Sequence, residues 1–146
     1  MNDPRHVDFA TLVRATPERV YESLTTGRGL DAWFTTGAEV QAEEGGEVIF
    51  RWEDWGLERY TGEFRGSVLE AVQPTRFVFR WPADSGGYQT TVEITIEAHE
   101  SGSVVRLIEH GFKDGSVGTQ DLLNRSSGWA QALTLLKFYL EHGVRY

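Results

Sequence analysis

The chain has 146 residues, and 25% of them are charged, with a formal net charge of −8 at pH 7. The length predicts one domain spanning residues 1–146, and the acidic balance argues against nucleic acid or an anionic membrane as partner, because both reward a basic surface. Cysteine is absent, which excludes disulfides and thiolate chemistry, and with no membrane-spanning or signal-like stretch we expect a cytoplasmic protein.

The first elements are a strand and two short helices. Residues 7–15 alternate between apolar and polar side chains and predict a strand. Thr16 and Pro17 have the residue types preferred at the N-cap and first position of a helix, so a helix is expected to begin there. A second short helix is expected around residues 30–34, with Trp33 pointing inward.

A series of strands separated by turn residues follows. Alternating apolar and polar residues predict strands at 38–41, 47–52, 58–70, 76–81, 89–98 and 104–111. This alternation is typical of an antiparallel sheet that is solvated on one face.

The longest expected element is a helix over residues 120–141, which Gly143 would end as a C-cap. Gly128 costs about 1 kcal/mol of helix propensity relative to Ala, and we expect close approach of another element there in preference to a tolerated defect. An apolar stripe follows one helix face: Leu122, Trp129, Leu133, Leu136 and Leu140. One helix covering the sheet predicts an α+β, helix-grip fold, with a curved antiparallel sheet of six to seven strands around the C-terminal helix.

Four segments carry a family resemblance. They are residues 15–25 (ATPERVYESLT), Trp33, residues 109–112 (EHGF), and Gly128-Trp129 with the leucines that follow. Together they resemble the START-like (SRPBCC) superfamily, and more narrowly its branch named after the activator of the heat-shock-protein-ninety ATPase. The resemblance covers nearly the whole chain and implies a cavity between sheet and helix. Members include lipid carriers, cyclase-like enzymes and stress-response regulators, so it implies fold more firmly than function.

Many large aromatic side chains are expected beneath the helix. They line either a cavity or a solid aromatic core, and we favour the cavity mainly because of the resemblance. The predicted function is binding of a small apolar or aromatic molecule there, without a cofactor. The candidate ligand-binding residues are Trp33, Phe50, Trp52, Tyr60, Phe64, Phe79, Trp81, Glu109, Trp129 and Leu133.

Glu109 is the one candidate catalytic residue. It shares strand parity with Val105 and Leu107, so it should point under the helix; the opposite parity would place His110 there instead. Without a cationic partner, burial would raise its pKa and suit proton transfer in a cyclase, dehydratase or hydrolase. The alternative is a structural Glu that pairs with a buried Arg, Tyr or backbone amide, or one that lies beyond the end of the cavity. A third possibility for the chain is a protein-interaction or chaperone-cofactor module without a ligand.

Two further features concern partners. The four His residues are scattered without metal-ligand spacing, so no metal site is expected. A second apolar strip on the long helix consists of Leu135, Phe138 and Tyr139. This strip either packs against the first strand and the small helices or forms a homodimer surface.

Overall fold

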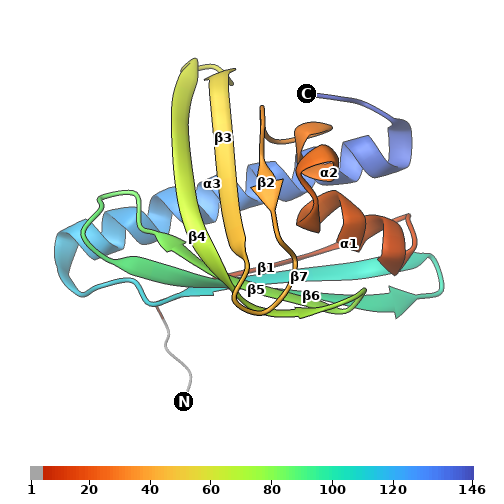
Figure 1. The fold of residues 1–146 in the computed structure, drawn as a ribbon, viewed down its shortest axis with the longest axis horizontal. Helices are drawn as coiled ribbons and strands as arrows, with labels where there is room; N and C mark the ends of the chain where they lie inside the picture. Colours follow the sequence, from red (N-terminus) through yellow and green to blue (C-terminus); the bar gives the residue numbers. More distant parts are fainter. Residues whose placement is uncertain (1–4) are drawn as a thin grey trace.

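One antiparallel sheet of seven strands, with the order β1-β7-β6-β5-β4-β3-β2, forms the frame of the protein (Figure 1). The computed structural model describes residues 5–146. The strands are β1 (Val7–Val13), β2 (Glu39–Val40), β3 (Glu47–Trp55), β4 (Tyr60–Val72), β5 (Arg76–Pro82), β6 (Gln89–His99) and β7 (Gly102–His110). The first strand pairs with the last strand, β7, and forms one edge of the sheet. The predicted helix-grip fold is confirmed.

Side-chain caps define the two short helices. The Thr16 hydroxyl accepts from the Arg19 amide at the start of α1 (Pro17–Thr25), as expected from its residue type. The Thr26 hydroxyl accepts from the Gly29 amide and starts α2 (Gly27–Asp31), three residues earlier than the predicted second helix. Thr26 therefore sets this boundary through a local hydrogen bond that apolar periodicity does not reveal.

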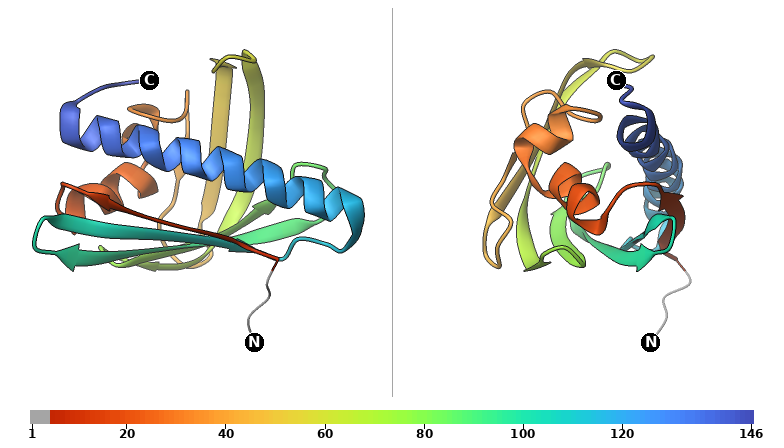
Figure 2. Two further views of the ribbon diagram at one scale, coloured as in Figure 1. Left: turned by 180° about the vertical axis from the view of Figure 1, so that it is seen from behind. Right: turned by 90° about the vertical axis from the view of Figure 1, so that its right-hand side faces the viewer.

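The long helix α3 (Gly115–His142) crosses the concave side of the sheet (Figure 2). It ends at Gly143, whose φ of 69° is the left-handed C-cap conformation that glycine adopts easily. Leu133 and Leu136 of α3 are buried in one core with Val92 and Leu107 of the sheet. No helix within residues 5–146 is long and apolar enough to cross a membrane.

Trp33 points inward, as predicted, and is completely buried. Its indole N–H donates to the Ser23 carbonyl at 3.0 Å, which ties the segment after α2 to α1. Burying a tryptophan whose polar atom is satisfied stabilises the core without an unpaired donor.

The β3–β4 hairpin rises beside α3 (Figure 1). Its residues form one side of the site described below. Asp54, near the end of β3, and Arg59, in the turn that follows, both have positive φ (52° and 54°). The Arg59 side chain donates to both carboxylate oxygens of Asp54, at 2.6 and 3.0 Å. The ion pair and the irregular register between Trp52 and Trp55 shape the end of this hairpin.

Candidate functional site

A pocket of about 490 Å³ lies between the β3–β4 hairpin, the end of β5 and the middle of α3. This volume falls within the range of about 300–1,000 Å³ that is usual for small-molecule sites. Its aromatic lining consists of Phe34, Trp52, Trp55, Tyr60, Phe64, Trp81 and Trp129, and the remaining lining residues are Glu58, Asp84, Asn124, Arg125, Gly128 and Gln131. The walls are therefore mostly aromatic, with a few polar groups.

The structure divides the ten candidate residues between pocket and interior. Five of them line the pocket: Trp52, Tyr60, Phe64, Trp81 and Trp129. The other five are buried outside its lining: Trp33, Phe50, Phe79, Glu109 and Leu133. Phe50 and Trp52 share a face of β3, and Phe79 and Trp81 share a face of β5. Within each pair, position along the strand rather than the face decides which residue lines the pocket.

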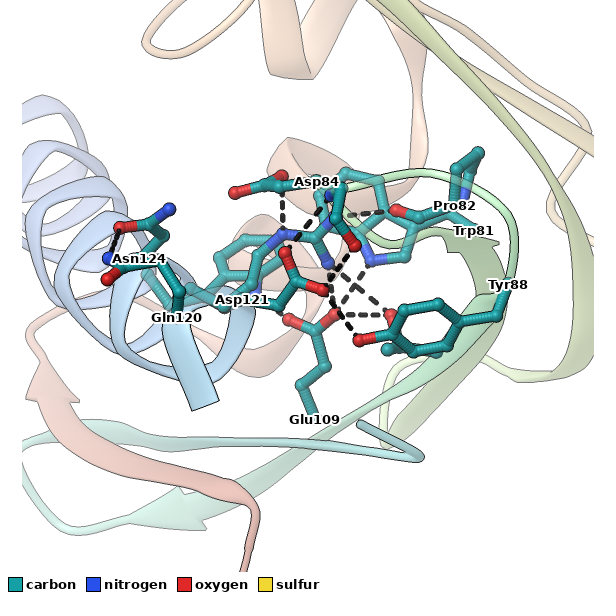
Figure 3. Close-up of polar contacts among 12 residues, drawn as sticks. Trp81, Pro82, Asp84, Tyr88, Glu109, Gln120, Asp121 and Asn124 are labelled. Carbon is teal, nitrogen blue, oxygen red and sulfur yellow. Dashed lines mark hydrogen bonds and ion pairs between the residues drawn. The ribbon is translucent and has the colours of Figure 1, made fainter. Parts of the chain in front are cut away.

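Glu109 lies directly beneath the pocket wall. Its side chain is fully buried, and one carboxylate oxygen accepts from the Trp129 indole N–H at 2.8 Å. The other accepts from the Trp81 indole at 3.0 Å and from the Thr90 hydroxyl at 2.6 Å (Figure 3). The carboxylate thus fixes both tryptophans from behind, which pre-organises the wall that a ligand would contact.

The predicted parity of the last strand is confirmed, since Val105, Leu107 and Glu109 are all buried. His110 lies on the opposite face, where its Nε2 is 2.8 Å from Glu93. The alternative with His110 beneath the helix is therefore wrong.

Arg125 is a cationic partner of Glu109. The expectation of a neutral Glu109 depends on the absence of such a partner. Its Nη1 makes an ion pair and a hydrogen bond with Glu109 Oε2, and the arginine side chain is only 7% exposed. The condition for an uncharged acid at Glu109, the absence of a cationic partner, is therefore not met. The structural alternative, a Glu paired with a buried Arg, describes this geometry.

Arg125 also joins α3 to the end of β5. Its Nε donates to Asp84 at 3.1 Å, its Nη2 donates to the Pro82 carbonyl at 2.6 Å, and the guanidinium carbon lies 4.4 Å from the Trp81 ring centroid. Sequence reasoning missed this residue, although one signal was available. Arg125 falls four residues before Trp129 and between Leu122 and Trp129 on the apolar stripe, where a charged residue requires a buried partner.

A second carboxylate, Asp121, anchors the β5–β6 connection to α3. It accepts from the Ser85 amide at 3.0 Å, the Ser85 hydroxyl at 2.6 Å and the Tyr88 hydroxyl at 2.7 Å. Burial by itself raises the pKa of the Asp121 carboxyl, but the hydrogen bonds from Ser85 and Tyr88 outweigh burial, and the pKa is lowered overall. The anion is thus favoured in the folded protein.

This depressed pKa predicts a contribution to the acid limb of the stability profile. A group whose folded-state pKa is lowered stabilises fully above its unfolded-state pKa of about 3.9, and the stabilisation disappears as pH falls through the folded-state value. We expect Asp121→Asn to lower the urea midpoint at neutral pH and to converge with wild type in acid. Urea midpoints measured from about pH 2.5 to 7 test this. A difference that stays constant across this range would contradict it.

Gly128 does not approach another element. A Cβ added at this position would meet no atom within 4 Å among the described residues, and Gly128 lines the pocket. The expected close backbone contact is therefore wrong. The missing side chain instead leaves space at the pocket, between Asn124 and Gln131 on the same helix.

The fold and this pocket define a START-like helix-grip protein. The chain belongs to the family described as Activator of Hsp90 ATPase homolog 1-like protein, whose family model matches residues 14–141. No curated protein gives a significant match.

Solved structures share the fold at low sequence identity. A Staphylococcus saprophyticus protein is 24% identical, covers 97% of this chain and 95% of its own, and superposes with a TM-score of 0.78. The Aha1 dimer from Colwellia psychrerythraea is 21% identical over 94% of this chain and 97% of that one, with a TM-score of 0.77. DynU16, from the dynemicin biosynthetic locus, is 20% identical over 99% of this chain and 51% of that one, with a TM-score of 0.81. At these identities the likeness establishes the fold alone.

Proposed function

We propose that the protein binds a small aromatic molecule in the pocket between the β3–β4 hairpin and α3. The observation that carries the proposal is a volume of about 490 Å³ lined by seven aromatic side chains. Flat aromatic walls favour a flat aromatic guest, because ring stacking adds to the burial of apolar area.

The polar groups of the pocket support the same proposal. The indole N–H groups of Trp52 and Trp55 are buried, and neither has an acceptor among residues 5–146. Both tryptophans line the pocket, and unsatisfied buried donors in a native structure call for a partner. These donors favour a ligand that carries an acceptor beside any charged group it has.

The enzyme alternative receives less support from this geometry. Glu109 was its candidate acid or base, and both carboxylate oxygens are engaged by indole, hydroxyl or guanidinium donors. A general acid or base must come within hydrogen-bond reach of its substrate, whereas Trp81 and Trp129 line the pocket and Glu109 does not. We therefore assign Glu109 the role of positioning these two indoles.

A fluorescent probe tests the binding site. N-phenyl-1-naphthylamine, which is neutral and brightens in apolar surroundings, should bind wild type and show increased emission. Gly128→Trp should abolish this increase, because the new side chain fills the pocket from a position with no atoms within 4 Å of its Cβ. Gly128→Ala should retain binding and stabilise the protein by about 1 kcal/mol through helix propensity.

Leu123→Trp provides the matched control, since Leu123 is exposed on the same helix and does not line the pocket. It should bind the probe as wild type does. Full emission from Gly128→Trp would place the probe elsewhere and contradict the proposed site. So would the absence of any emission increase with wild type.

We also propose that the exposed side of α3 forms a homodimer contact. Phe138 is half exposed, while Leu135 and Tyr139 are partly buried against the core, so Phe138 is the member of the predicted strip that is most available to a partner. The Colwellia relative is described as a dimer, which supports the proposal. Phe138→Glu is expected to give a monomer with unchanged circular dichroism. A wild type that already sediments as a monomer at high concentration would end the dimer proposal.

A further inference from the structure

We propose that the molecule bound in this pocket is an organic cation, an aromatic compound that carries a protonated amine, with Asp84 as its counter-ion. The inference rests on the proposed binding function and specifies the chemical class of the ligand. It follows from the charges around the pocket, from the Asp84 carboxylate oxygen that accepts no hydrogen bond within residues 5–146, and from the aromatic walls.

The single cation of the lining is already compensated. Arg125 pairs with Glu109 through Nη1 and with Asp84 through Nε. Figure 3 shows Asp84 above and Glu109 below in this cluster. A ligand carboxylate or phosphate that approached Arg125 would also approach both acids. Like charges repel, so these two carboxylates make the pocket unfavourable for an anionic ligand.

Asp84 retains acceptor capacity at the pocket. Arg125 binds its Oδ1 at 3.1 Å, and within residues 5–146 no donor binds its Oδ2. Asp84 lines the pocket, and its side chain is 35% exposed. An ammonium group, which has only donors to offer, would complete the hydrogen bonding of this carboxylate.

The remaining charges of the lining have the same sign as Asp84. Glu58 is a second pocket-lining carboxylate, whereas the nearby cation Arg59 is bound by Asp54 and does not line the pocket. The negative charge of Asp84 also acts on Tyr60. The pKa of the Tyr60 phenol is raised mainly by burial and in addition by the charge of Asp84. Counting Glu109 beneath the wall, the pocket and its wall hold three carboxylates and one guanidinium.

Aromatic ring faces are the second attractive element for a cation. The pocket already holds one cation against ring faces, since the Arg125 guanidinium lies 4.4 Å from the Trp81 ring centroid and 5.6 Å from the Phe64 ring centroid. Trp52, Trp55 and Tyr60 line the pocket on the hairpin side and are not used by Arg125 in this way. An ammonium paired with Asp84 would lie in the pocket that these rings line.

Three ligands of similar shape and different charge test the preference: 2-(1-naphthyl)ethylamine, 2-(1-naphthyl)ethanol and the anion of 1-naphthaleneacetic acid. Isothermal titration of wild type at neutral pH should show the amine binding at least about tenfold more tightly than the alcohol, and the carboxylate binding more weakly than both. Asp84→Asn should reduce the affinity for the amine about tenfold and leave the affinity for the alcohol unchanged. Asp114→Asn, which removes an exposed charge outside the pocket, serves as the matched control and should preserve the preference.

The outcomes separate this inference from the function on which it rests. If the alcohol or the carboxylate binds wild type as tightly as the amine, the cation inference is overturned while an aromatic pocket remains. If none of the three binds, the proposed function fails and the inference fails with it. If Asp114→Asn loses the preference for the amine, the preference comes from the net charge of the protein, and the role of Asp84 is overturned. The wild-type comparison decides the charge preference even if Asp84→Asn does not fold.

Discussion

Glu109→Gln is expected to lower the free energy of unfolding by about 3 kcal/mol at neutral pH, near the lower end of the range for breaking a buried ion pair. The substitution keeps the shape of the side chain but removes the charge that compensates Arg125, which is buried. The new amide group would also present donors to the Trp81, Thr90 or Trp129 donors that now bind the carboxylate. Asp84 still compensates Arg125 in part, which is why the loss is not larger.

The same substitution at Glu93 is the control. Glu93 is 28% exposed and pairs with Arg76 and His110 on the opposite face of the sheet. Partly exposed ion pairs contribute at most about 1 kcal/mol, so Glu93→Gln should cost much less than Glu109→Gln. Urea denaturation of both variants measures the difference. Equal losses would mean that Glu109 is not the buried structural anion described above. Adding Arg125→Met to Glu109→Gln should recover part of the loss, because it removes the uncompensated charge.

Trp129→Ala is expected to cost about 3–5 kcal/mol, as large-to-small substitutions of buried aromatic residues do. Trp129 is 4% exposed, and its ring centroid lies 5.5 Å from that of Trp81 and 6.2 Å from that of Phe34. Its removal also eliminates the 2.8 Å hydrogen bond to Glu109. Packing and hydrogen bonding therefore act in the same direction.

Trp129→Phe separates these two contributions. It retains most of the ring contacts and loses the indole N–H, so it should cost about 1–2 kcal/mol, the effect of leaving a buried acceptor with one partner fewer. Chemical denaturation of both variants provides the measurement. A loss below about 1 kcal/mol for Trp129→Ala would show that the site relaxes around the gap, and that Trp129 behaves as a compliant pocket wall rather than as core.

Local features of the sequence were sufficient for the architecture. Thr16, Pro17 and Gly143 mark helix ends through their own caps, because a cap depends on residues within one turn. Strand alternation correctly placed Glu109 beneath the helix, because successive side chains in a strand point to opposite faces. The C-terminal helix and the antiparallel sheet follow from the same two periodicities.

The position of each aromatic residue along its strand was decided only by the tertiary structure. Phe50 and Trp52 share a face of β3 and both belong to the buried core, yet of the two only Trp52 lines the pocket. Periodicity specifies the face of an element but not where a crossing helix covers it. The sequence therefore predicted an aromatic interior without separating the core from the pocket wall.

The charge state of the site was likewise decided by contacts between distant elements. Glu109 on β7, Arg125 on α3 and Asp84 after β5 meet only when the helix lies across the sheet. The sequence alone identified a buried carboxylate and left open whether a buried arginine pairs with it. Electrostatic interaction depends on distance and burial in three dimensions, so the choice between a neutral acid and an ion pair required the folded structure.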